Sequence, residues 1–184
     1  MGKKVIIVGN GASLLDMHNG SLIDAFDVVV RINDFKTIGY ELYTGKKTDI
    51  LFTCRLDMYN SLEKISQFPE VITCLLMNPY HDVVIAPEVL ASPNIKDNIN
   101  WKHVDILRDL VGMSDPRYPS TGLICIDYMI RRYGHVFITG FDNFKAGNRH
   151  YYEEGRRMDP SPHSPTHQRL YLQQLEKRGV LARV

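Results

Sequence analysis

The chain has 184 residues, enough for one well-packed domain and few for a two-domain enzyme. Its apolar content of 44% and charged content of 23% are ordinary for a globular protein. The formal net charge of +1 gives no electrostatic reason to expect a nucleic-acid or anionic-membrane partner.

The cysteines and the apolar runs predict the compartment. Cys54, Cys74 and Cys125 form no C-x-x-C pair, and an odd count fits no complete disulfide framework, so a reducing compartment is expected. No apolar run approaches the ~20 residues of a transmembrane helix, and a strand so close to Met1 leaves no room for a signal peptide. We therefore expect a cytoplasmic domain without a transmembrane segment.

The first structural signal is Val5–Val8, four β-branched residues that predict a strand buried on both faces of a parallel sheet. Gly9-Asn10-Gly11 then favours a tight turn, and Ala12-Ser13-Leu14 predicts the entry to a helix. Such a strand–turn–helix aims backbone N–H groups beyond the strand end, where an anion fits. The third glycine of G-x-G-x-x-G and the lysine of a P-loop are missing, so a turn that binds nothing remains open.

Further apolar runs predict the other elements. Strands are expected at residues 26–33, 49–53, 70–77 and 136–139, with a short edge strand near 180–181. Helices are expected at residues 57–67, from Ser120 or Thr121 to Gly134, and at 166–178, with a short helix or loop at 21–24. Asn33 ends the second strand, where an asparagine either faces the ligand crevice of an open α/β sheet or simply forms a turn.

Two regions have no clear pattern. Residues 82–117 are expected to be irregular, with a strand or a helix both open at 103–107, and residues 142–165 are expected to form a polar catalytic loop. Strands that alternate with helices predict a single α/β domain over residues 1–184. Its expected core is a Rossmann-like, doubly wound, mostly parallel sheet flanked by helices.

His150, His163 and His167 lie in or beside the polar loop, a place where catalytic groups are common. His163 and His167 have i,i+4 spacing, but Pro165 lies between them and no glutamate follows the first, so no zinc site is expected. No G-x-S-x-G motif is present and Ser120 follows a proline, which argues against a serine nucleophile.

Four segments, in this order along the chain, resemble the motifs of the eukaryotic-type sialyltransferases. They are residues 8–11 with 23–33 for the large motif, 118–122 through 140–141 for the small motif, 149–153 for the third motif, and His163 for the very small motif. His163-Ser164 and the helix that follows also resemble the end of the bacterial oligosaccharide sialyltransferases. The resemblance spans most of the chain.

The resemblance implies a sialyltransferase-type variant of the GT-A architecture. It also implies inverting transfer of sialic acid, or of a related ulosonic acid such as Kdo, from a CMP-sugar donor to a glycan or glycolipid hydroxyl. No metal or other cofactor is expected, since the sequence has no D-x-D pair and the departing monophosphate can be held by hydrogen bonds. Such a protein is expected to be bacterial or virus-encoded, and peripheral to a membrane at most.

The family's site residues carry over by position. The resemblance implies that Asn10 and Asn33 hold the phosphate and ribose, that Tyr118 and His150 hydrogen-bond the departing phosphate, and that His163 is the general base. The other donor-binding residues that it implies are Gly9, Gly11, Ser120, Thr121, Gly122, Gly140 and Phe141. A histidine base with a pKa near ~6.5 can contribute roughly 100- to 10,000-fold to the rate.

The chain departs from the family in three ways. Residues 3–5 offer no cysteine to pair with Cys125, so the disulfide of the secreted members is not expected. Gln168 stands where a glutamate usually follows the motif histidine, which places the role of this position in doubt. The chain is also short, so its acceptor-binding elements are expected to be reduced.

Two other functions remain open. The chain could be a CMP-binding module that has lost transfer activity, which Gln168 and the short length favour slightly. An NAD-binding Rossmann domain is a weaker alternative, because Asn33-Asp34 only half supplies the acidic residue that such a site needs at the end of its second strand.

Overall fold

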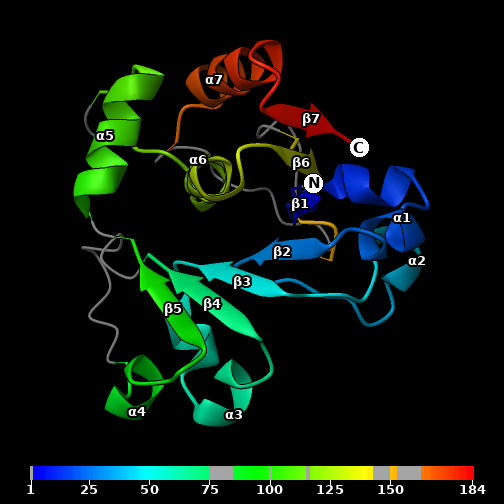
Figure 1. Ribbon diagram of the computed structural model, residues 1–184, viewed down its shortest axis with the longest axis vertical. Coiled ribbons are helices and arrows are strands. Elements are labelled where there is room, and N and C mark those ends of the chain that lie inside the picture. The colour runs from blue at the N-terminus through cyan, green and yellow to red at the C-terminus, as the bar shows by residue number, and fades with distance from the viewer. Residues whose placement is uncertain (1, 75–84, 100, 115–116, 143–149, 153–162) are drawn as a thin grey trace.

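The computed structural model describes residues 2–74, 85–99, 101–114, 117–142, 150–152 and 163–184. Seven parallel strands form one sheet in the order β5-β4-β3-β2-β1-β6-β7 (Figure 1). The strands are β1 (Val5–Val8), β2 (Val28–Ile32), β3 (Ile50–Thr53), β4 (Glu70–Thr73), β5 (Ile95–Asn98), β6 (Val136–Thr139) and β7 (Leu181–Arg183). The predicted doubly wound α/β fold is therefore confirmed.

Helices cover both faces of the sheet. They are α1 (Gly20–Asp24), α2 (Glu41–Thr44), α3 (Leu62–Ile65), α4 (Pro87–Leu90), α5 (Trp101–Val111), α6 (Thr121–Tyr133) and α7 (Pro165–Lys177), with 3-10 turns η1 (Ala12–Asp16) and η2 (Leu56–Tyr59). Ile7 and Val30 face the large core shared with α5, α6 and α7. Ile6 and Val29 face the opposite core, together with Leu14 of η1 and Ile23 of α1. This alternation explains why β1 and β2 are apolar on both faces.

The chain reverses its direction of winding at β1. Strands β2 to β5 are added in order on one side of β1, and β6 and β7 are added on the other. In open α/β sheets, ligands bind beside the carboxyl ends of the strands at such a switch point. The fold thus places a candidate site next to the Gly9-Asn10-Gly11 turn.

The expectation that residues 82–117 are irregular is wrong for most of the described part of that region, which contains α4, β5 and α5. Pro87 stands at the start of α4, where its missing N–H costs no hydrogen bond. Residues 103–107 belong to a helix. The helix expected at 57–67 is divided into η2 and α3. Residues 75–77 of the expected fourth strand lie outside the described residues.

The two later helices and the edge strand agree with prediction. Ser120 caps α6 by accepting a hydrogen bond from the Leu123 amide, and Gly134 ends the helix with a φ of 82°. The C-terminal helix is α7, and the edge strand after Gly179 is β7. Within the described ranges, none of these helices is long and apolar enough to cross a lipid bilayer.

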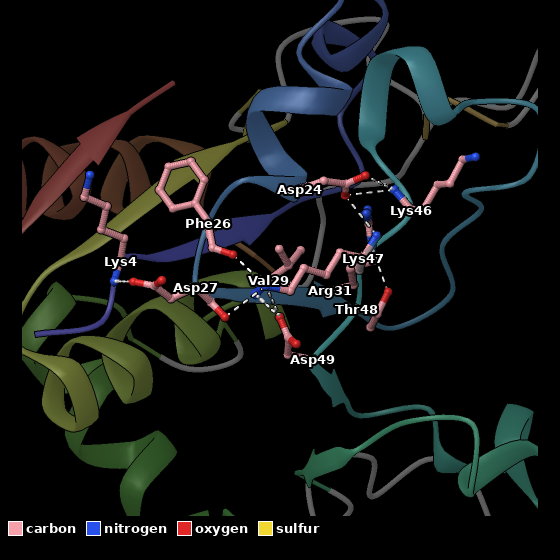
Figure 2. Close-up of polar contacts among 10 residues, drawn as sticks. All are labelled: Lys4, Asp24, Phe26, Asp27, Val29, Arg31, Lys46, Lys47, Thr48 and Asp49. Carbon is pink, nitrogen blue, oxygen red and sulfur yellow. Dashed lines mark hydrogen bonds and ion pairs between the residues drawn. The ribbon is translucent and has the colours of Figure 1, made fainter.

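A polar network joins β2 to the loop before β3 (Figure 2). Arg31 is 1% exposed, and its guanidinium donates to the carbonyls of Thr44 and Lys47 and to the Thr48 hydroxyl at 2.8 to 3.0 Å. Burial lowers the pKa of Arg31 to about 10, so it stays charged at neutral pH. The carboxylate of Asp24 accepts hydrogen bonds from the amides of Lys46 and Lys47 at 2.9 to 3.0 Å.

Asp24→Ala is expected to lower the free energy of unfolding by about 2 kcal/mol, because the amides of Lys46 and Lys47 lose a charged acceptor. Urea denaturation followed by circular dichroism measures this change. Asp16→Ala, which removes the same charge from an exposed position, should change stability by less than about 0.5 kcal/mol. Equal changes in the two variants would show that the carboxylate does not hold this loop.

Candidate active site

A cavity of about 180 Å³ lies where β1, β2 and β6 end, next to the start of α6. It brings together all the predicted site residues except Tyr118. These are Gly9, Asn10, Gly11, Asn33, Ser120, Thr121, Gly122, Gly140, Phe141, His150 and His163. Segments from nearly the whole length of the chain therefore meet at the switch point of the sheet.

The turn after β1 packs directly on the turn after β6. The amides of Gly9 and Gly11 donate to the carbonyls of Thr139 and Gly140, both at 2.8 Å. A Cβ atom on Gly9 would lie 2.4 Å from the Gly140 carbonyl oxygen, so only glycine permits this approach. The two turns form the floor of the cavity as one unit.

A carboxylate of the protein, that of Asp142, lies beside the turn after β1. The Asp142 carboxylate accepts hydrogen bonds from the Ser13 amide at 3.2 Å and from the Ser13 hydroxyl. The Gly11 amide is bonded to Gly140. The expectation that these N–H groups are open to a ligand's anion is therefore wrong for Gly11 and Ser13, because the turn after β6 supplies their acceptors.

Asn10 and Asn33 both line the cavity and use opposite ends of their side-chain amides in hydrogen bonds with the protein. The side-chain amide nitrogen of Asn10 donates to the carbonyls of Ile32 and Asp34 at 3.0 and 2.9 Å, so its oxygen remains as an acceptor. The side-chain oxygen of Asn33 accepts from the Cys54 amide at 2.9 Å, so its NH₂ group remains as a donor. Among the described residues, Asn33 is also the only non-glycine residue with a positive φ, 51°, which asparagine tolerates well.

His163 is half-buried and held in one tautomer. Its Nδ1 atom lies 3.0 Å from the carbonyl oxygen of Tyr118, which can only accept, so Nδ1 carries the proton. The Tyr118 ring packs edge-on against the imidazole, with centroids 5.3 Å apart. In the neutral ring Nε2 is therefore the basic atom. Burial lowers the pKa of His163, an effect that the hydrogen bond to Tyr118 opposes in part.

His150 reaches the cavity through an antiparallel bridge to Gly11. Its Nδ1 atom is 3.1 Å from the Tyr152 hydroxyl, which itself donates to the Asp34 carbonyl at 2.6 Å. The hydroxyl proton is thus engaged, so Nδ1 of His150 is the donor in this pair. Arg149 and Glu153, the other polar residues expected in this motif, lie outside the described residues.

Tyr118 contacts His163 through its carbonyl oxygen and its ring, and it is not among the described residues that line the cavity. Two more polar residues line the cavity: Gln168, whose role the sequence left in doubt, and Asp142, which directly follows the predicted residues Gly140 and Phe141. The apolar wall of the cavity was not predicted, and it consists of Ile32, Leu123, Ile126 and Leu172. Part of this wall could have been predicted from the sequence. Leu123 and Ile126 are three residues apart in α6, so they lie on one face of the helix close to its N-terminus.

The three cysteines are free thiols. Among the described ranges, which omit most of the polar loop at residues 142–165, no group of three or more His, Cys, Asp or Glu side chains is placed to hold a metal ion.

Comparisons with known proteins identify the family. A parallel sheet with its cavity at the switch point, lined by polar turns and a histidine of fixed tautomer, defines an open α/β protein with a candidate ligand site. Residues 3–109 match the model of glycosyltransferase family 29 (sialyltransferase). The chain belongs to this family.

Two human sialyltransferases are similar in sequence to this chain. The human CMP-N-acetylneuraminate-beta-galactosamide-alpha-2,3-sialyltransferase 4 is 26% identical, over 97% of this chain and 63% of its own length. The human type 2 lactosamine alpha-2,3-sialyltransferase is 25% identical, over 97% of this chain and 63% of its own length. The chain therefore spans less than two thirds of these relatives.

The fold is that of the solved sialyltransferases. A mammalian sialyltransferase aligns with a TM-score of 0.68 at 19% identity, over 100% of this chain and 69% of its own. The sialyltransferase CstII from Campylobacter jejuni, solved with the substrate analogue cytidine-5'-monophosphate, aligns with a TM-score of 0.61 at 21% identity, over 98% of this chain and 79% of its own.

Proposed function

We propose that the chain transfers sialic acid, or a related ulosonic acid, from a CMP-sugar donor to a hydroxyl of a glycan or glycolipid, in the cytoplasm and without a metal ion. Membership of family 29 and the likeness to the alpha-2,3-sialyltransferases support this class of reaction. The observation that carries the proposal is the fixed tautomer of His163, whose basic Nε2 belongs to a ring that lines the same cavity as the two asparagines.

The cavity wall has the hydrogen-bonding groups that a nucleotide requires. The NH₂ group of Asn33 can donate to a phosphate oxygen, and the oxygen of Asn10 can accept from a ribose hydroxyl. This assignment gives each asparagine the ligand group that its remaining atom can bind. His150 and the start of α6 complete the anion-binding side of the site.

His163 acts as the general base in this proposal. Its Nε2 atom takes the proton of the acceptor hydroxyl while that oxygen forms a bond to the anomeric carbon of the sugar. The bond from that carbon to the phosphate breaks on the opposite face, and CMP leaves with the bonding electrons. One displacement from the opposite face inverts the configuration. The departing phosphate monoester needs only oriented hydrogen bonds from the wall.

The proposal is tested by incubating the protein with CMP-sialic acid and lactose in excess EDTA and measuring released CMP. CMP and a sialylated product are expected without added metal. Binding of CMP-sialic acid with no release, with lactose or with a panel of glycans, would instead support the inactive CMP-binding module. Failure to bind CMP and CMP-sialic acid at all would overturn the donor assignment.

A further inference from the structure

Asn33, the residue that follows β2, has a backbone conformation that needs support. Its φ of 51° lies in the left-handed region, which is unfavourable for residues with a side chain, although asparagine tolerates it better than most. Such strain persists only where the surrounding structure holds the residue in place, and it is common at binding sites. Asn33 also lines the cavity. The groups that hold its backbone therefore affect what the cavity can bind.

Three polar groups of Asn33 are bonded to the stretch that runs from the end of β3 through η2. Its backbone amide donates to the carbonyl of Phe52 at 2.9 Å. Its side-chain oxygen accepts from the Cys54 amide at 2.9 Å and from the Thr53 hydroxyl at 3.3 Å. Its backbone carbonyl accepts from the hydroxyl of Tyr59 at 2.6 Å. These bonds leave the side-chain NH₂ group as the donor that Asn33 can offer to a ligand.

Tyr59 reaches Asn33 from a separate element. It is the last residue of η2, and its half-buried ring packs edge-on against Phe68, with ring centroids 5.5 Å apart. This contact fixes the ring, so that the hydroxyl is held at the Asn33 carbonyl. Without the hydroxyl, the carbonyl loses its donor and Asn33 can relax toward a more common backbone conformation. The side-chain amide would then move with the backbone that carries it.

Two other tyrosine hydroxyls hold the rest of the turn after β2. The hydroxyl of Tyr152 donates to the carbonyl of Asp34 at 2.6 Å. The hydroxyl of Tyr151 accepts from the Lys36 amide at 2.9 Å and donates to the Lys36 carbonyl. Because these bonds do not involve Tyr59, the turn stays in place when that residue is changed. Removal of the Tyr59 hydroxyl should therefore loosen only the start of the turn.

We propose that Tyr59 is a positioning residue for the donor, and that its hydroxyl holds the backbone of Asn33 where the side-chain NH₂ group can reach the nucleotide phosphate. This inference rests on the proposed function, in which that NH₂ group donates to a phosphate oxygen. Tyr59 is not among the described residues that line the cavity, so it acts through Asn33 and does not touch the ligand. Its contribution to nucleotide affinity should therefore depend on the presence of the Asn33 side chain.

The test compares the wild type with Tyr59→Phe, which removes the hydroxyl and keeps the ring against Phe68. Tyr128→Phe is the matched control, because it also removes a bonded hydroxyl, one that donates to the Asp97 carboxylate at 2.7 Å, away from the described cavity wall. Tyr59→Phe is also combined with Asn33→Gly, since glycine accepts a positive φ but has no side-chain amide. Calorimetry measures the dissociation constant of CMP, and thermal denaturation measures the stability of each variant.

Tyr59→Phe is expected to bind CMP roughly 3- to 10-fold more weakly, the range for loss of one hydrogen bond, whereas Tyr128→Phe should bind CMP like the wild type. In the Asn33→Gly protein, Tyr59→Phe should change the affinity by less than about twofold, because the group that it positions is gone. Equal losses with and without the Asn33 side chain would assign Tyr59 a general structural role and overturn the inference. An unchanged affinity of Tyr59→Phe would also overturn it. Failure of the proposed function is seen separately: a wild type that does not bind CMP would refute the donor assignment, and this inference with it.

Discussion

Replacing His163 with alanine is expected to slow the release of CMP from CMP-sialic acid by roughly 100- to 10,000-fold, the range for loss of a general base. The imidazole is the proposed acceptor of the hydroxyl proton, and its tautomer is set by the Tyr118 carbonyl. Binding of CMP should be retained, because Asn10 and Asn33, the residues proposed to bind the nucleotide, are unchanged. The comparison separates a chemical role for His163 from a role in donor binding.

The pH profile gives a second measurement of the same group. Burial lowers the pKa of His163, so the neutral base persists below the ordinary value of about 6.5. The rate should therefore rise with pH through a value below about 6.5 and stay level above it, where His163 carries no proton. His18→Ala, at an exposed position away from the cavity, is the control and should leave the profile unchanged. A rate that falls as His163 loses its proton would contradict its role as the base.

Gly9→Ala is expected to lower the free energy of unfolding by about 3 kcal/mol or to prevent folding, at the upper end of what overpacking costs. The added Cβ would lie 2.4 Å from the carbonyl oxygen and 3.0 Å from the carbonyl carbon of Gly140, both backbone atoms that cannot rotate away. The ends of β1 and β6 would have to separate, and the hydrogen bond from Gly9 to Thr139 at 2.8 Å would weaken.

Two other glycines provide a graded comparison for this prediction. In Gly122→Ala the new methyl group would meet a ring carbon of Phe141 at 2.9 Å, and a side chain can shift, so a smaller loss of stability is expected. Gly2→Ala meets nothing within 4 Å and should leave stability unchanged. Thermal and urea denaturation rank the three variants. A Gly9→Ala protein as stable as Gly2→Ala would show that the two turns are not packed as described.

The sequence predicts correctly those elements in which buried apolar residues recur at a short, regular spacing along the chain. Val5–Val8 lies between two helical layers, so every residue is apolar and a strand is the simplest solution. Ile95–Asn98 is an edge strand with three exposed residues, so its composition carries no such pattern. Helix α5 does have buried residues at helical spacing, Val104, Leu107 and Val111, but Pro87 and Pro93 before it favour an irregular connection.

In the site, too, local patterns could be predicted from the sequence, whereas contacts between distant residues could not. The glycine-rich turn and the motif histidines could be located because each is a local pattern, and all of them line the cavity. The bond between Gln168 and Ser120 joins residues 48 positions apart, and that between Asp142 and Ser13 joins residues 129 positions apart. No spacing rule along the chain predicts which distant polar groups become partners, since only the folded sheet brings them together.

The position of β1 inside the sheet has a consequence for biosynthesis. Its partner β6 is encoded more than a hundred residues later, whereas β2 follows it closely. Ribosomes add roughly 5–20 residues per second, so for many seconds the nascent polypeptide carries an apolar strand with one unsatisfied edge. A premature stop codon before Val136 would leave that edge permanently available for pairing with other chains. Truncated products of this gene should therefore aggregate and depend on chaperones, even though they retain five of the seven strands.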